Sequence, residues 1–264
     1  MPADSRRITY LGVAVVTIMA SVLMLAPDGR GRALGGPRPD EPPPTAVKDE
    51  AARTPWPAER KRFVDEVREA MFAGFRGKAE SLEEAMRMCD AALREDPKNA
   101  DALVWHGCGL VFQAGQAFRK GDAKVGSQLW TDGLAEVDRA VALEPERASV
   151  RIARATLLTS VARFDPDPEE SARLLKTGVA DYEKVRELQK PYFNMLSVHA
   201  RGELYGGLAE GWYLLNDRDK VKAYHERMIR ELPGSEYARR AQAWFDNPDP
   251  KGKYTPITCI GCHR

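Results

Sequence analysis

Apolar residues in the middle of the chain recur every three to four positions, the spacing of one face of an α-helix. Three segments show this most clearly, each reaching a proline that cannot continue a helix: residues 84–97, 134–145 and 221–233. Further helices are predicted over 101–119 and 123–143, and a closing helix over 235–245. No sustained alternation of period two is present, so the fold class is predicted to be all-α.

A long uncharged run dominates the N-terminal end. Residues 8–27 follow Arg6 and Arg7 without a single charge, and a helix that crosses a bilayer needs about 20 apolar residues. The run is longer than the apolar core of a signal peptide, about 7–15 residues, and no clear Ala-x-Ala cleavage site follows. We expect residues 1–27 to form an uncleaved signal-anchor; a cleaved signal peptide is the alternative.

The basic start of the chain predicts its orientation, because positive charge stays on the cytoplasmic side. The body is then expected outside the cytoplasm, held in the periplasm by the inner membrane through residues 8–27, or secreted if the signal is cleaved. Residues 28–57 are rich in proline and are expected to form a disordered, semi-rigid stalk. The helical body is expected over 58–245 and an irregular tail over 246–264.

The overall charge is balanced. Lys and Arg number 40 and Asp and Glu 39, a net charge of +1. This balance lacks the basic excess of a nucleic-acid binder, so no nucleic-acid partner is expected. Because the charges are interleaved along the helical segments, they are typical of solvated helix surfaces.

The helical segments share a second pattern. Helices end in Ala92-Leu93 before Pro97 and in Ala140-Val141 before Pro145, and the helix after Pro97 places Trp105, Gly107 and Leu110 along one face. A similar set, Leu208, Ala209 and Trp212, opens the last pair, with Asn216-Asp217 in the turn. In these features residues 80–243 resemble the tetratricopeptide repeat (TPR) family. The resemblance implies stacked helical hairpins that bind protein partners.

The spacing departs from that family. Pro97, Pro145, Pro191 and Pro233 follow one another at 48, 46 and 42 residues, against a TPR repeat of about 34. We therefore expect longer helices, in a TPR-like solenoid of about three or four hairpins closed by a capping helix. The aromatic residues of these helices are expected to pack in the core: Trp105, Trp130, Trp212, Tyr213 and Trp244.

The chain ends on a chemical motif. Cys259-Ile260-Gly261-Cys262-His263 has the form C-x-x-C-H, the attachment signature of c-type haem. Two thiols at this spacing form thioethers to the two vinyl groups, and the histidine that follows binds the iron on its proximal side. We predict one covalent haem c on Cys259 and Cys262, with His263 as iron ligand, as in a c-type cytochrome. An exported chain suits this prediction, because haem c is attached outside the cytoplasm.

Other uses of the terminal cysteines stay open. They are a redox dithiol, a disulfide or part of a metal site, although structural zinc requires four ligands and no second such motif is present. Cys89 and Cys108 lie on neighbouring predicted helices and are either a disulfide or two small buried residues.

In this sequence Arg264 alone follows the histidine, so we do not expect downstream helices to enclose a haem on this tail. A sixth ligand would come from elsewhere, and Met or His commonly supplies it. The candidates are His106, His199, His225, Met195 and Met228, of which His225 and Met228 lie nearest the tail in sequence.

The leading hypothesis is a membrane-anchored, extracytoplasmic TPR-like scaffold that carries one haem and exchanges electrons with a redox protein bound to its surface. The alternative is a TPR-like interaction scaffold without haem. No phosphate loop, nucleophile motif or carboxylate–histidine cluster is recognisable in the sequence, so an electron carrier or interaction protein is expected rather than an enzyme.

Overall fold

The computed structural model describes residues 58–247. Within them it contains nine α-helices and two short 3-10 helices, with no strand, so the predicted all-α class is confirmed for this part. The predicted anchor (1–27), the stalk (28–57) and nearly all of the tail lie outside the described residues. None of the helices from residue 58 to 247 is both long and apolar enough to cross a membrane.

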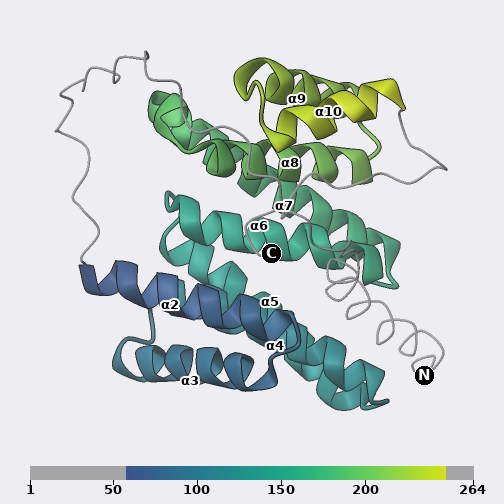
Figure 1. Cartoon of the computed structure of the whole chain (residues 1–264). Helices are drawn as coiled ribbons and strands as arrows, with labels where there is room; N and C mark the ends of the chain where they lie inside the picture. Colours follow the sequence, from purple (N-terminus) through teal and green to yellow (C-terminus); the bar gives the residue numbers. More distant parts are fainter. Residues whose placement is uncertain (1–57, 248–264) are drawn as a thin grey trace, which may run out of the picture.

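Consecutive helices form hairpins that are stacked in chain order (Figure 1). Four hairpins and a closing helix follow one another: α2 (Ala58–Phe75) with α3 (Ala79–Glu95), α4 (Ala100–Arg119) with α5 (Ala123–Leu143), α6 (Ala148–Val161) with α7 (Pro168–Gln189), α8 (Val198–Leu214) with α9 (Arg218–Glu231), and α10 (Glu236–Asp246). The 3-10 helices η1 (Ala162–Phe164) and η2 (Lys190–Met195) follow α6 and α7. The helix predicted over 123–143 coincides with α5. The closing helix predicted over 235–245 is α10, shifted by one residue toward the C-terminus.

Short polar side chains begin most of these helices. Asn99 accepts a hydrogen bond from the Ala102 amide at 3.1 Å, and Asp217 accepts one from Lys220 at 3.0 Å. Such caps satisfy amides that have no partner inside the helix. The turn between α8 and α9 places Asn216 at a φ of 62°, a left-handed conformation that asparagine tolerates better than most residues.

The packing is local along the chain. All substantial helix contacts among the described residues join elements one or two places apart, the arrangement of a solenoid. The first helices of successive hairpins touch one another, α2 with α4, α4 with α6 and α6 with α8. The second helices α5, α7 and α9 have no such substantial mutual contact within this part. The layer formed by the second helices, here called the outer layer, is therefore more open than the layer formed by the first helices.

A close crossing joins α4 to α5. A Cβ atom added to Gly107 would lie 2.6 Å from the carbonyl oxygen of Gly133, and one added to Gly133 would lie 2.7 Å from that of Gly107. Only glycine allows two backbones this close without a shift. Gly107, which belongs to the repeat pattern of the sequence, thus permits the close approach of α4 to α5.

Two buried aspartates tie neighbouring helices together. Asp101, 1% exposed, accepts from Arg60 Nε at 2.8 Å and lies 3.2 Å from Arg147. Asp181, also 1% exposed, accepts from Arg154 Nε at 2.7 Å and pairs with Arg151. Buried carboxylates need such partners, because an unpaired charge in the interior is costly.

Candidate functional site

The predicted haem-attachment residues Cys259, Cys262 and His263 lie outside the described residues. Helix α10 ends at Asp246, so the motif begins 13 positions after the last helix of the body. No group of three or more potential metal ligands is present within residues 58–247. The attachment site therefore stays a prediction from the sequence.

The five sixth-ligand candidates occupy different environments. His225 and Met228 are fully buried at 0% exposure, with the His225 ring 4.6 Å from that of Trp244. Burial lowers the pKa of His225 to about 4, so its imidazole is neutral at neutral pH. Met195, in contrast, is 76% exposed in η2.

The other two histidines are engaged with side chains of the body. His106 Nδ1 lies 2.6 Å from Glu136 and its Nε2 lies 3.4 Å from Asp90. His199 Nδ1 lies 2.9 Å from the Tyr237 hydroxyl. Met195 is the most exposed of the five candidates and the one that an external group reaches most readily.

Cys89 and Cys108 are both buried and both free, so the structure contains no disulfide between them. Burial raises the pKa of each thiol, that of Cys108 to about 12. The structure therefore supports the interpretation of Cys89 and Cys108 as two small buried residues and not as a disulfide.

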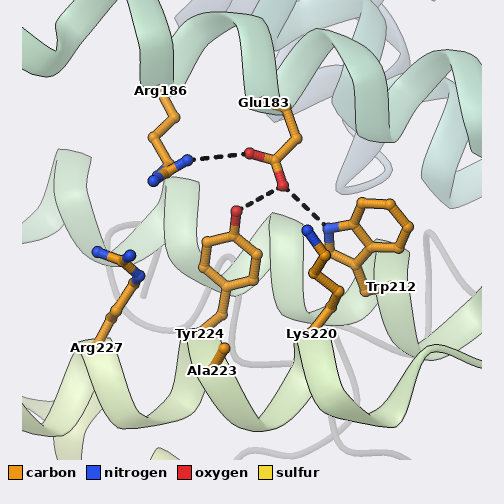
Figure 2. A pocket seen from close by; sticks show the side chains of 7 residues that line it. All are labelled: Glu183, Arg186, Trp212, Lys220, Ala223, Tyr224 and Arg227. Carbon is orange, nitrogen blue, oxygen red and sulfur yellow. Dashed lines mark hydrogen bonds and ion pairs between the residues drawn. The ribbon is translucent and has the colours of Figure 1, made fainter.

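A hollow of about 280 Å³ lies in the open outer layer, where α7 and α9 face each other above the end of α8 (Figure 2). We call it the cationic hollow. It is lined by Glu183, Arg186, Trp212, Lys220, Ala223, Tyr224 and Arg227. Helical spacing explains the lining: residues 183 and 186 share one face of α7, and residues 220, 224 and 227 share one face of α9.

Glu183 is the centre of the hydrogen bonds in this hollow (Figure 2). Its Oε1 accepts from the Tyr224 hydroxyl at 2.5 Å and from Trp212 Nε1 at 3.2 Å. Its Oε2 accepts from Arg186 at 3.3 Å. Burial of Tyr224, with the hydrogen bond to Glu183 and the charge of that carboxylate, raises the pKa of the phenol. Tyr224 therefore remains a protonated donor, and one carboxylate joins three helices.

Positive charge exceeds negative charge in the hollow. Arg186, Lys220 and Arg227 face one carboxylate, Glu183. The Lys220 ammonium lies 5.2 Å from the centre of the Trp212 ring, and the Arg186 guanidinium lies 6.0 Å from that of Tyr224. These are distances of cation–π contact. The arrangement suits the binding of an anion against an aromatic wall.

A second hollow, of about 480 Å³, adjoins the first. We call it the apolar hollow. It shares Glu183 and Trp212 with the cationic hollow and adds Val179 and Leu215 to the lining, with Lys176, Ala180 and Asp217 around them. The shared residues make the two hollows neighbours beside α7: the cationic hollow lies between α7 and α9, and the apolar hollow lies between α7 and the C-terminal end of α8.

Apart from Trp212, the residues that line the cationic hollow were not candidates in the sequence. Trp212 was predicted to pack in the core, which is wrong in part: the side chain is only partly buried, lines both hollows and donates to Glu183. Spacing alone reveals that Lys220, Tyr224 and Arg227 share a helix face, but not that this face meets Glu183. The contact depends on how one hairpin is stacked on the next.

The chain matches no known protein family model and no curated protein sequence.

Proposed function

We propose that this chain is a membrane-anchored scaffold outside the cytoplasm, built of TPR-like hairpins, that carries one haem c on its tail and exchanges electrons with a protein partner. The single observation that carries the proposal is the place of the C-x-x-C-H motif. It follows a body that closes at Asp246, after 12 intervening residues. This separation supports a haem held outside the packed helices.

The roles of the residues follow from the motif. Cys259 and Cys262 would form the thioethers and His263 would bind the iron. When attached, the haem supplies one-electron transfer, while the protein determines where it is presented. Twelve residues extend up to about 40 Å at 3.3–3.6 Å each, so the tail has the length to present the haem to a partner on the body.

Met195 is the sixth ligand that we favour. A buried ligand such as Met228 would have to leave the core to reach an external iron, and His106 would have to leave two carboxylates. The thioether of Met195 is exposed and needs no such rearrangement. His199 is second, since 49% of its side chain is exposed.

The helical body supports the TPR-like part of the proposal. Each hairpin is joined to the next by its first helix, and the Gly107–Gly133 crossing provides the close approach of paired helices. In solenoids, the surfaces left open by such stacking bind proteins.

The attachment of haem is tested with the full chain expressed beside a cytochrome c maturation system. We expect a pyridine haemochrome spectrum from the wild type and none from a Cys259→Ala/Cys262→Ala variant. A Cys89→Ala/Cys108→Ala variant is the matched control and should keep the spectrum if it folds. A colourless wild type, under conditions that mature a known cytochrome, would refute the proposal.

Ligation by Met195 is tested on the loaded protein. We expect Met195→Ala to keep the haem but to change its reduction potential and the visible spectrum of its oxidised form. Met88→Ala, on α3, is the control and should change neither. An unchanged potential in Met195→Ala would show that Met195 does not bind the iron.

An interaction scaffold without haem is the second function, and the two adjoining hollows beside α7 favour it. In that case the terminal cysteines act as thiols, as a disulfide or as metal ligands. A colourless protein that still binds a partner through these hollows would support this function over the first.

A further inference from the structure

We propose that the cationic and apolar hollows together form one docking site for an acidic peptide segment of a partner protein. A carboxylate of that segment would sit among Arg186, Lys220 and Arg227, and a neighbouring apolar side chain would pack on Ala180 and Leu215. This inference rests on the proposed function, in which the body holds a protein partner, and it specifies the chemistry of that partner.

The cations of the hollow are incompletely neutralised. Lys220 forms no ion pair with a carboxylate of the described residues, and its Nζ lies over the Trp212 ring instead. Arg227 reaches Glu231 only at 3.5 Å, and Glu231 also accepts from Arg230 at 2.8 Å. A carboxylate from outside would therefore find donors that the protein itself leaves mostly unused.

Glu183 shares only Arg186 with such a ligand, among the three cations of the hollow. Both of its oxygens are already hydrogen-bonded, to Tyr224, Trp212 and Arg186. Its role is that of a positioning residue, which holds the phenol and the indole as an aromatic wall. Arg186 donates to Glu183 through one nitrogen, and a guanidinium has five N–H donors, so it can bind a second carboxylate as well.

The neighbouring apolar hollow distinguishes a peptide from a simple anion. Inorganic phosphate or sulfate would use the three cations but would leave Ala180 and Leu215 uncovered. Successive residues of an extended peptide are about 3.3 Å apart. A segment that lies across the two adjoining hollows can therefore place a carboxylate in one and an apolar side chain in the other within a few residues. Charge and apolar surface are then used together.

The shape of the site favours a peptide over a membrane surface. The hollow lies between α7 and α9 with α8 beneath it (Figure 2). A narrow chain can enter such a groove, whereas lipid headgroups in a plane contact the protruding helices. An acidic protein segment is thus the occupant that the surface fits.

The test uses the full chain and a fluorescein-labelled peptide of sequence Gly-Ser-Glu-Leu-Asp-Leu-Glu-Gly, with binding followed by fluorescence anisotropy. The comparison peptide carries Gln and Asn in place of Glu and Asp. We expect the acidic peptide to bind at least tenfold more tightly than the neutral one. Binding should weaken as salt rises, because partly exposed charges are screened.

Variants assign the binding to the hollow. Arg186→Gln/Lys220→Gln/Arg227→Gln should weaken binding of the acidic peptide at least tenfold. The control removes two arginines and one lysine from the exposed surface of the first two hairpins and should bind like the wild type: Arg94→Gln/Arg119→Gln/Lys120→Gln.

Two further measurements keep the test decisive. Circular dichroism checks that the triple variant is folded, and the single variant Lys220→Gln, which breaks no ion pair with the described carboxylates, should still weaken binding severalfold. Equal binding by the triple variant and its control, or by the acidic and neutral peptides, would overturn the proposal.

Sedimentation with phosphatidylglycerol vesicles tests whether the site binds a membrane surface instead of a peptide. Capture by vesicles through the same three cations, without binding of the peptide, would also overturn the proposal, since the site would then be a membrane contact. Its failure is distinguishable from that of the proposed function. A protein that carries haem but ignores the peptide refutes the docking site alone, whereas a colourless protein that binds the peptide refutes the haem alone.

Discussion

The hydrogen bond between Tyr224 and Glu183 is expected to couple the last two hairpins energetically. Tyr224 is 5% exposed, and its hydroxyl donates to Glu183 Oε1 at 2.5 Å. The perturbation is a double-mutant cycle of Glu183→Ala and Tyr224→Phe. Each change removes one partner, and the double variant removes both.

The magnitude follows from the burial of the pair. A hydrogen bond to a charged group contributes about 1.5–3 kcal/mol net. Since 28% of the Glu183 side chain is exposed, water partly solvates it and the lower end applies. We expect Tyr224→Phe to cost about 1.5 kcal/mol and Glu183→Ala about 2.5 kcal/mol, because the latter leaves a buried hydroxyl without an acceptor. The double variant should cost about 2.5 kcal/mol, a coupling energy of about 1.5 kcal/mol.

The assay is urea unfolding followed by far-ultraviolet circular dichroism, with equal m-values required across the cycle, because parts of a solenoid can unfold separately. Tyr224→Phe combined with Glu84→Ala, in the first hairpin, is the control and should be additive. If the costs of Glu183→Ala and Tyr224→Phe also add within about 0.5 kcal/mol, the hydrogen bond does not couple the hairpins and the reasoning is refuted.

Three further predictions concern packing and pH. Gly107→Ala should destabilise by about 1–3 kcal/mol in the same assay, because its Cβ would meet the Gly133 carbonyl oxygen at 2.6 Å; a stabilised variant would contradict the close crossing. Burial lowers the pKa of His225 to about 4 from its ordinary 6.5, so stability should fall as the pH falls from 6.5, by about 3 kcal/mol at pH 4. His225→Phe should remove this loss, and an equal loss in the variant would refute it. For His106, burial opposes the charged form, but the hydrogen bond and charge of Glu136 outweigh it and raise the pKa. His106→Gln should therefore cost most stability below pH 6.5 and progressively less as the pH rises through the folded pKa; a cost independent of pH would contradict this.

The helices themselves were largely predictable, since their signals are local. The predicted range 123–143 is that of α5, and the turn at Asn216-Asp217 separates α8 from α9 as expected. Gly107 is part of the repeat pattern that the sequence shows, and it lies against Gly133 in the structure. A period of 3.6 residues, a capping side chain and a proline stop each act within a few residues, so they can be seen without a structure.

The candidate docking site was not predictable, since it depends on the stacking of hairpins. Glu183 meets Tyr224 across 41 residues of chain, and no local pattern relates the two. The tertiary structure also decided the environments of His225 and Met195. His225 is fully buried and Met195 is exposed, although the sequence offers both equally as candidate iron ligands.

The sequence by itself determined the chemistry that the chain can carry: an apolar run long enough for a membrane, a proline-rich spacer, a helical body and a C-x-x-C-H tail. These are properties of residue type and spacing. The tertiary structure alone decided that α7 and α9 face each other with three cations and one carboxylate between them. The physical reason is that the angle and register between packed helices are set by side chains meeting across the whole interface, as at Gly107 and Gly133, and no single segment contains that information.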